Sequence, residues 1–455
     1  MNPVFQTVRW MAEAIRTKQI SARELMQAHL DRIAVANPAL NAIVELDPEA
    51  ALKAADHADA QREPRGPLHG VPMTVKGAWD CAGMNNTAGT LGRKGHVAQQ
   101  DATVIARMRR AGAIPFAVTN LPEFSLAFES DNLVYGRSNN PFDATRTPGG
   151  SGGGGAAAIA SGCSPFEVGG DMGGSIRLPC HNCGIAGLKP TLGRVPLSGY
   201  FPGPFGLVTL LATAGPMARS VDDLYPLLEL LSGPDGLDAN VADARQHDPA
   251  RVDVSRLRIA FHTDNGVIAP SSETSATVMA AAKALSATEV TMGEIPLTGS
   301  YDIYMGLLGA DGGAGLAQLT TICGTAENSA IFRGIMRLLA PRATNAEQFA
   351  ALLFQRDVFR SQVAGFFQNY DVLLCPVNAY PALPHGTSWD HVEAFSYTMA
   401  HNLSGCPAAT VRFGTSSEGL PIGVQVVAGH WREDIALAVA ARLESMTPPT
   451  WRSGS

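Results

Sequence analysis

Residues 147–162, TPGGSGGGGAAAIASG, place six glycines around Ser151 and then continue into a run of alanines. A glycine run of this kind is typical of a phosphate-binding loop, of a flexible linker, or of a segment whose backbone takes part in chemistry. The alanine-rich end favours a buried helix, and a linker does not usually lead into one. The run therefore belongs to a folded element.

The phosphate-binding interpretation finds little support in the surrounding residues. A phosphate loop needs a lysine directly after its glycines, and the next lysine is Lys189. A dinucleotide fingerprint fits the run in almost any register, and the acidic residues that follow, Glu167 and Asp171, do not end a clear second strand. A nucleotide-binding module stays a remote alternative.

A second glycine cluster, GGDMGGSIRLP at residues 169–179, indicates hydrolytic chemistry instead. Ser175 follows Gly173 and Gly174, where missing side chains let successive backbone N–H groups point into one cavity and bind an oxyanion. Ser175 is therefore a candidate nucleophile that needs a base. His181 is near in sequence, but no Asp or Glu stands at a spacing that would complete a histidine triad.

The next residues, CHNC, raise the question of a metal or redox site. Cys180, His181 and Cys183 would need further ligands at a partner spacing, and no second CxxC or HxxxH pattern occurs. Seven cysteines are an odd number at an ordinary density, which argues against a disulfide framework. We therefore favour buried small side chains here over a metal or redox site.

A third motif, GVPMTVKG at residues 70–77, precedes both glycine clusters, and the three in this order resemble the amidase signature family of serine hydrolases. Similar blocks lie at residues 119–143, 215–224, 370–377 and 401–428, so the resemblance covers roughly residues 10–445. It implies an α/β fold, a single large domain with a central mixed β-sheet covered by helices on both faces. It also implies cleavage of C–N bonds other than peptide bonds. Urethanases and aryl acylamidases are the members that we expect this chain to resemble in activity.

The resemblance assigns catalytic roles residue by residue. Ser175 matches the nucleophile, Ser151 a bridging serine that follows a non-proline cis peptide bond, and Lys76 the base. Lys76 must be neutral to accept a proton, and the apolar VPMTV before it is compatible with the burial that favours a neutral amine. No metal or organic cofactor is expected. The expected oxyanion hole consists of the backbone N–H groups of Met172, Gly173, Gly174 and Ser175. The expected supporting residues are Gly150, Gly152, Asp171 and Arg177.

Two positions depart from the family pattern. Gly152 stands where the family usually has a second serine, and Gly77 stands where an Asp commonly follows the base lysine. These departures affect the surroundings of Ser151 and Lys76 and leave the catalytic set itself intact.

Apolar segments near the motifs predict a hydrophobic acyl or aryl group in the substrate. They are residues 125–130 and 197–215, and the predicted substrate-lining side chains are Phe128, Tyr200, Phe201 and Phe205. The prediction is a hydrolase of hydrophobic amides, anilides or carbamates (urethanes). The alternative is the glutamine-hydrolysing subunit of an amidotransferase, which needs an anchor for a carboxylate. No basic cluster provides one, although single arginines such as Arg337 or Arg342 could do so in three dimensions.

Composition limits the partners. A net charge of −7 with no run of Lys and Arg disfavours nucleic acid and anionic membranes, and no stretch is apolar enough for a signal peptide or a membrane span. We expect a cytoplasmic protein whose partner is a small hydrophobic amide or carbamate. A homodimer is allowed but not required.

The chain alternates between strand and helix patterns, as expected for one domain over residues 1–455. We place the catalytic core at about residues 66–225 and a C-terminal sheet and helix portion at about 255–446. Predicted strands are 41–46, 66–76, 112–120, 255–264, 370–377 and 419–429. Predicted helices are 21–37, 47–61, 101–111, 156–162, 271–287 and 432–446, the first opened by a capping box of Ser21 and Glu24.

Overall fold

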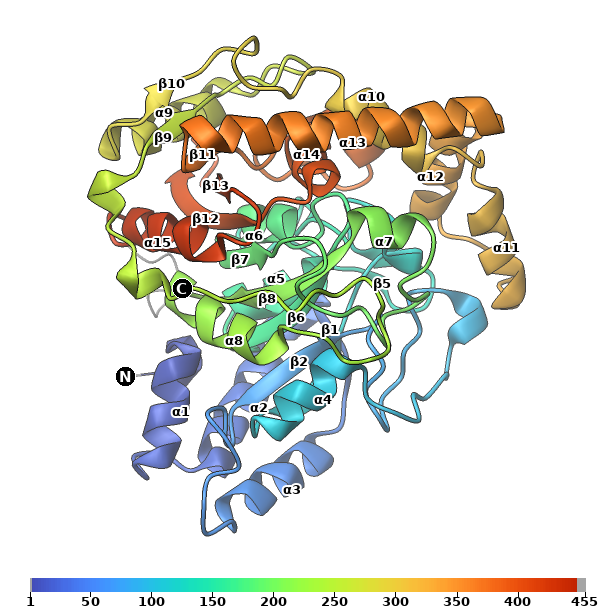
Figure 1. The fold of residues 1–455 in the computed structure, drawn as a ribbon. Helices are drawn as coiled ribbons and strands as arrows, with labels where there is room; N and C mark the ends of the chain where they lie inside the picture. Colours follow the sequence, from blue (N-terminus) through green and yellow to red (C-terminus); the bar gives the residue numbers. More distant parts are fainter. Residues whose placement is uncertain (1, 448–455) are drawn as a thin grey trace.

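A mixed sheet of eleven strands runs through the centre of the computed structural model, which describes residues 2–447 (Figure 1). The strand order is β1-β3-β2-β6-β8-β7-β12-β13-β11-β9-β10, and β4 pairs with β5 apart from it. This is the predicted single α/β domain. The strands are β1 (Ile43–Leu46), β2 (Pro72–Lys76), β3 (Ile114–Thr119), β4 (Asp131–Asn132), β5 (Gly136–Arg137), β6 (Phe166–Asp171), β7 (Ala186–Lys189), β8 (Thr213–Ala218), β9 (Ile259–Phe261), β10 (Thr288–Glu289), β11 (Val372–Pro376), β12 (Ala408–Thr415) and β13 (Pro421–Ala428).

The part of the sheet that positions the site is parallel. β2 lies parallel to β3 on one side and to β6 on the other, and every residue of these three strands is buried. Strands covered on both faces have this property. Because parallel strands end at the same edge, Lys76 at the end of β2 and Asp171 at the end of β6 lie at one edge of the sheet, where α/β proteins build their sites.

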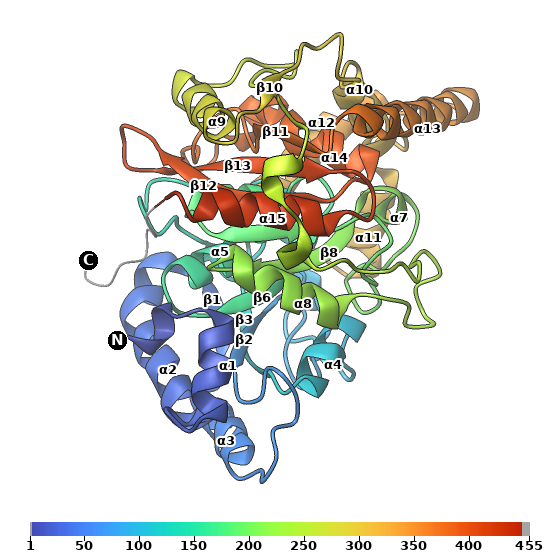
Figure 2. The same ribbon diagram turned by 60° about the vertical axis from the view of Figure 1, so that its left-hand side comes forward.

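Helices cover both faces of the sheet (Figure 2). α8 packs on β8 and α15 on β12 and β13, whereas α5 and α6 contact each other on the opposite face. The helices are α1 (Val8–Arg16), α2 (Ala22–Leu40), α3 (Pro48–Asp59), α4 (Thr103–Arg110), α5 (Gly153–Ala160), α6 (Arg177–Cys183), α7 (Leu207–Leu211), α8 (Leu224–Leu231), α9 (Ser272–Ala284), α10 (Ser300–Leu308), α11 (Ala314–Ile322), α12 (Ala330–Leu339), α13 (Ala346–Asn369), α14 (Ser396–Ser404) and α15 (Glu433–Glu444).

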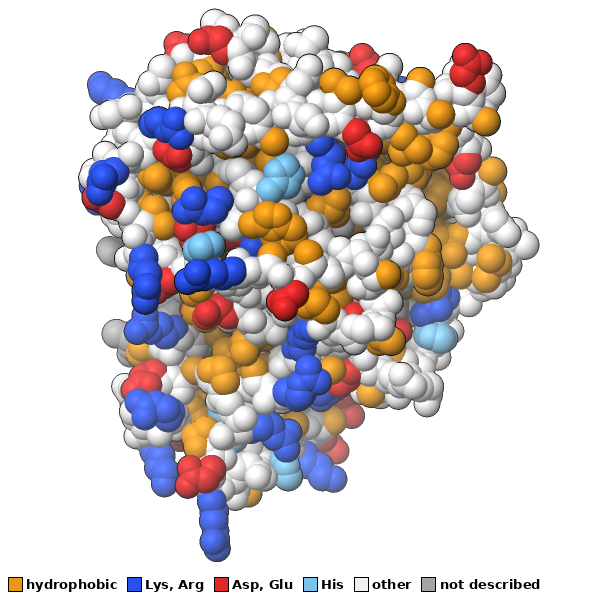
Figure 3. All heavy atoms as spheres, in the orientation of Figure 1, with side chains coloured by type: hydrophobic (Ala, Val, Ile, Leu, Met, Phe, Trp, Pro, Cys, Tyr) orange, Lys and Arg blue, Asp and Glu red, His pale blue; other side chains and the backbone are white. Residues whose placement is uncertain are grey.

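A second hydrophobic core lies under a group of helices from the C-terminal half. We call α10, α12, α13, α14 and the 3-10 helix η8 (Ser388–Phe395) the helical cover. Its buried side chains include Phe332, Phe359 and Met399, and α10 packs against both α13 and α14. Large apolar side chains of α13 and α11 are exposed, among them Phe354 and Ile322. Figure 3 shows that hydrophobic side chains reach the surface over this part of the molecule.

The predicted elements are present with shifted ends. The capping box of Ser21 and Glu24 opens α2 as predicted, but the helix does not stop at Asn37. It includes Pro38 and ends at Leu40, because the Asn41 N–H still bonds the carbonyl of Asn37 and Asn41 then turns into the left-handed region. The strand predicted over 255–264 shrinks to β9, since residues 254–256 form a 3-10 helix. Among the described residues, no helix is both long and apolar enough to cross a membrane.

Candidate active site

Ser175 lies in the tight turn between β6 and α6. Gly174 takes a φ of +124°, a conformation that favours glycine. The Asp171 carboxylate accepts hydrogen bonds from the N–H groups of Gly174 at 2.9 Å and Ile176 at 3.1 Å. These bonds fix the backbone on both sides of Ser175.

A fully buried ion pair supports this turn. Arg177 donates to Asp171 at 2.8 Å, and neither side chain is exposed. Burial alone would raise the pKa of Asp171, but the Arg177 guanidinium and the Asn402 amide hold that pKa well below its ordinary value. The other Arg177 contacts are the Thr398 carbonyl at 3.0 Å, Gln425 Oε1 at 2.6 Å and Asn402 Oδ1 at 2.5 Å. The pair therefore ties the Ser175 turn to α14 and β13.

The base and the bridging serine predicted from the sequence are in contact. Lys76 is completely buried, and its Nζ donates to Ser151 Oγ at 2.7 Å. The Gly150–Ser151 peptide bond is cis, as the resemblance implies. Gly152 then donates its N–H to the carbonyl of Ser175 at 3.2 Å. The structure thus brings Lys76, Ser151 and Ser175 together at one edge of the sheet.

The glycines around Ser151 let this segment pack closely against neighbouring parts of the chain and do not serve as a flexible linker. Gly153, Gly154 and Gly155 already belong to α5. A Cβ on Gly154 would lie 2.5 Å from the backbone nitrogen of Asn120, and one on Gly153 would lie 2.5 Å from Ser130 Oγ. Helix α5 can therefore touch neighbouring backbone only because these side chains are missing.

The departure at Gly152 has the same cause. A Cβ at this position would lie 2.8 Å from the carbonyl oxygen of Ser175, and 3.5 Å from Sδ of Met217. A serine here would therefore displace the carbonyl that binds the Gly152 N–H.

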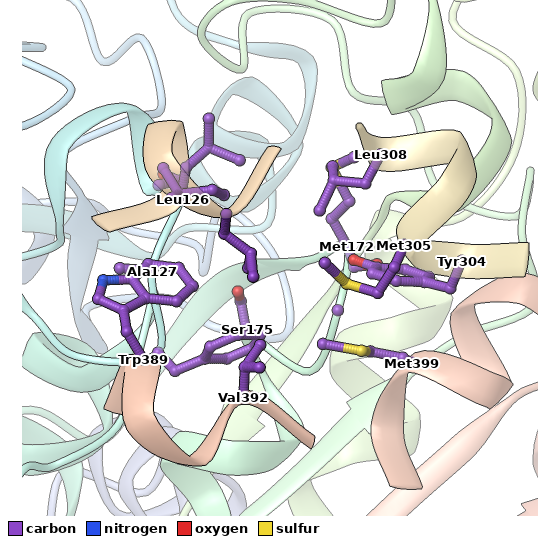
Figure 4. Close-up of a pocket in the computed structure, with 15 residues that line it drawn as sticks. Leu126, Ala127, Met172, Ser175, Tyr304, Met305, Leu308, Trp389, Val392 and Met399 are labelled. Atoms are coloured by element: carbon purple, nitrogen blue, oxygen red, sulfur yellow. The ribbon is translucent and has the colours of Figure 1, made fainter. Parts of the chain in front are cut away.

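Ser175 opens into an apolar pocket, into which its hydroxyl points (Figure 4). Most of the wall comes from the helical cover and from residues 125–128. The lining residues are Ser125, Leu126, Ala127, Phe128, Met172, Gly173, Ser175, Tyr304, Met305, Leu308, Ile335, Leu338, Trp389, Val392 and Met399. None of these is charged, so the pocket suits an uncharged, hydrophobic group.

The four predicted oxyanion donors are not equivalent. Met172, Gly173 and Ser175 line the pocket, whereas the Gly174 N–H is directed at Asp171. This corrects the expectation for Gly174, whose N–H the Asp171 carboxylate takes up when it fixes the turn. On the other side of the same backbone, the Tyr304 hydroxyl donates to the carbonyl of Met172 at 3.1 Å. Burial raises the pKa of Tyr304, which keeps it a donor.

Of the predicted substrate-lining side chains, the structure places one at the pocket. Phe128 lines it and stacks on Phe395 with ring centroids 3.8 Å apart. Tyr200, Phe201 and Phe205 line a separate hollow instead, which corrects their predicted place. The reason is that Tyr200 is bridged to Trp79 and contacts Lys76, whereas the pocket wall comes largely from α10, α12, η8 and α14.

Sequence reasoning missed most of the pocket wall. Tyr304 and Met305 of α10, Trp389 of η8 and Met399 of α14 were not predicted. The apolar side chains of residues 300–308 were the available signal. They indicate a helix with a buried face and do not indicate what that face covers.

The CHNC residues serve the interior of the fold. Cys180, His181 and Cys183 are buried on α6. Both ring nitrogens of His181 are engaged with backbone, since Nδ1 accepts from the Gly423 N–H at 2.9 Å and Nε2 lies 3.1 Å from the Tyr380 carbonyl oxygen. Over residues 2–447, no group of three or more His, Cys, Asp or Glu side chains is arranged to hold a metal ion.

One buried carboxyl group lies close to Lys76. Glu167 of β6 is completely buried, and its Oε2 accepts from the Thr119 hydroxyl at 2.7 Å. Burial raises its pKa to about 7, against smaller opposing effects of Thr119, Thr74 and Lys76. Glu167 therefore favours its neutral form over much of the acid range.

Comparisons with known proteins extend over almost the whole chain. The family model described as Amidase matches residues 24–437. Fatty-acid amide hydrolase 2 of Homo sapiens is 31% identical over 472 residues, which covers 95% of this chain and 87% of that protein. A glutamyl-tRNA(Gln) amidotransferase subunit of Thiobacillus denitrificans is 33% identical over 473 residues and covers 96% of both. A solved bacterial aryl acylamidase of the amidase signature family has a TM-score of 0.85 at 25% identity, covering 98% of this chain and 96% of that one.

Proposed function

The chain belongs to the amidase signature family, and on that premise we propose that it hydrolyses hydrophobic amides, anilides or carbamates through an acyl-enzyme on Ser175. The observation that carries this proposal is the position of Ser175. It stands at an uncharged apolar pocket, next to the buried contact between Lys76 and Ser151.

Acylation begins with proton transfer along the catalytic set. Neutral Lys76 takes the proton of Ser151 as Ser151 takes the proton of Ser175, whose Oγ forms a bond to the substrate carbonyl carbon. The carbonyl electron pair moves to oxygen, and the N–H groups of Met172, Gly173 and Ser175 stabilise the resulting oxyanion by hydrogen bonds. When the C–N bond breaks, Ser151 returns a proton to the leaving nitrogen and recovers one from Lys76. Water then attacks the acyl-enzyme by the same route and releases the acid.

The pocket supports a hydrophobic acyl or aryl group. Its wall combines Met172, Met305 and Met399 on one side of Ser175 with Trp389 on the other (Figure 4). Methionine side chains adapt to irregular apolar shapes. The names of two relatives, a fatty-acid amide hydrolase and an aryl acylamidase, are in line with such a substrate.

The rival function is glutamine hydrolysis within an amidotransferase. The similarity to a glutamyl-tRNA(Gln) amidotransferase subunit is the observation that supports this rival function. That reaction needs a cation to anchor the substrate carboxylate. Neither Arg337 nor Arg342 is among the described residues that line the Ser175 pocket, and no Lys or Arg is. The pocket thus favours the hydrophobic substrate.

A covalent probe tests the mechanism. We expect a fluorophosphonate to add once to the wild-type chain, at Ser175, as measured by intact mass and peptide mapping. Ser175→Ala should lose the adduct and Lys76→Ala should form it slowly. Ser125→Ala is the matched control, because Ser125 lines the same pocket and should leave labelling unchanged. Labelling elsewhere, or an active Ser175→Ala variant, would contradict the mechanism.

A substrate panel tests the specificity. N-acyl anilides, aryl carbamates and glutamine should be compared by kcat/KM on the same preparation. Turnover of glutamine above the anilides and carbamates would favour the rival function.

A further inference from the structure

The catalytic lysine has a second hydroxyl partner that the mechanism above does not use. Besides Ser151 Oγ at 2.7 Å, Lys76 Nζ donates to Tyr200 Oη at 3.1 Å. All three side chains are buried. Two hydroxyl groups from different segments thus hold the lysine nitrogen between them.

The surroundings hold the Tyr200 ring in place. Its centroid lies 4.5 Å from that of Trp79 in an edge-on arrangement, and the backbones of these two residues are bridged. On another side, a Cβ at Gly170 would lie 3.0 Å from Cζ and 3.1 Å from Oη of Tyr200. The missing side chain at position 170 of β6 leaves room for the Tyr200 ring beside Lys76.

We propose that Tyr200 is a positioning residue that orients the amine of Lys76 toward Ser151. A neutral amine has two N–H bonds and one lone pair, and only the lone pair can take the Ser151 proton. In the structure the amine donates to both hydroxyl groups. When Lys76 is neutral, an N–H kept on Tyr200 Oη restricts rotation about the Cε–Nζ bond and leaves the lone pair to accept the Ser151 hydroxyl proton. No bond of Tyr200 forms or breaks in this role.

This assignment differs from the sequence-based role of Tyr200 in substrate contact. Tyr200 is not among the described residues that line the Ser175 pocket, and it borders the separate hollow instead. The inference rests on the proposed function, because it takes Lys76 as the base. It adds that the base works at its full rate when Tyr200 Oη also holds its orientation.

The test removes the hydroxyl and keeps the ring. In Tyr200→Phe, we expect kcat for an anilide and the rate of fluorophosphonate labelling at Ser175 to fall about 10- to 100-fold. This is less than the loss of a whole general base, which is worth about 10²- to 10⁴-fold, because Lys76 itself is kept. KM and the thermal unfolding midpoint should stay near wild type. Tyr135→Phe is the matched control, since Tyr135 Oη bonds Glu45 away from the site and its loss should not change labelling.

A second variant disturbs the position of the Tyr200 hydroxyl without removing it. Gly170→Ala places a methyl group against the Tyr200 ring, so labelling should slow although Tyr200 is intact. If Tyr200→Phe raises KM and leaves labelling unchanged, Tyr200 contacts substrate and the inference is wrong. If Tyr200→Phe matches wild type while Lys76→Ala is slow, the inference fails and the proposed function stands. If Lys76→Ala is also fast, the proposed function fails first.

Discussion

Two regions meet at Ser175, and they are built differently. The glycine-rich segments 147–155 and 169–175 position the reacting groups by backbone contacts so close that most of their glycines admit no further atom. The helical cover provides the opposite wall with ordinary apolar side chains on helices. On the proposed function, the reacting groups therefore depend on closely packed backbone that leaves little room for added atoms, whereas substrate shape depends on apolar side chains of the helical cover. Substitutions in the two regions should therefore have different consequences.

The largest effect is expected where the two regions are joined, at Arg177. Arg177→Met removes the cation from a fully buried pair and leaves the Asp171 carboxylate without its partner. Breaking such a pair destabilises a protein by about 3–5 kcal/mol, to be measured by urea unfolding. Arg16→Ala, which breaks the exposed pair with Glu13, should change stability by less than about 1 kcal/mol. Equal effects of the two variants would show that burial of the pair is irrelevant.

The next effect compares the same substitution in the two regions. Gly154→Ala adds a methyl group 2.5 Å from the backbone nitrogen of Asn120, and we expect a loss of about 3 kcal/mol. Gly365→Ala adds one in open space on α13, where alanine favours the helix and should raise stability by about 0.5–1 kcal/mol. The changes in free energy of unfolding, measured with urea, should have opposite signs. If Gly154→Ala leaves stability unchanged, the two regions do not differ in this respect.

A pH-dependent effect is expected on the catalytic side, at Glu167. Its pKa rises from an ordinary 4.5 to about 7 on folding, so the folded state binds a proton that the unfolded state has released between these values. The free energy of unfolding therefore falls as pH rises through this window, by about 3 kcal/mol in total above pH 7. In Glu167→Gln the side chain at position 167 no longer titrates, so this pH dependence is lost. Urea unfolding of both proteins at pH 5 and pH 8 measures it. If the wild type and Glu167→Gln differ in free energy of unfolding by the same amount at both pH values, the prediction is wrong.

The smallest effect is expected in the helical cover. Leu308→Ala enlarges the pocket, so kcat/KM should shift about tenfold toward bulkier acyl groups in a series of N-acyl anilides. Labelling by a small fluorophosphonate should not change, because the reacting groups stay in place. Met279→Ala, on the distant helix α9, should leave the preference as it is. A large loss of labelling in Leu308→Ala would mean that the cover also positions the chemistry.

The sequence predicted which residues meet at the edge of the sheet better than it predicted the pocket wall, for a physical reason. Lys76, Ser151 and Ser175 each stand in a short glycine-rich or apolar motif, and the structure brings them together. Tyr304 and Trp389 stand in segments whose apolar residues would suit any helix with a buried face. Their place at the pocket depends on how helices far apart in sequence pack, which residue type alone does not encode.

The errors have equally local causes. Tyr200 is aromatic and close to a family motif, but its hydroxyl contacts Lys76 and its side chain borders a separate hollow. The Gly174 N–H was expected to face the pocket, and the turn set by Asp171 directs it away. Both outcomes depend on the direction of a bond, which neither composition nor spacing determines.

The hydrogen bonds of Arg177 also set an order in time. Thr398, Asn402 and Gln425 bind its guanidinium, and they leave the ribosome roughly 220 to 250 residues after Ser175 does. A growing or truncated chain thus carries Ser175 before the side chains and the carbonyl that bind the Arg177 guanidinium exist.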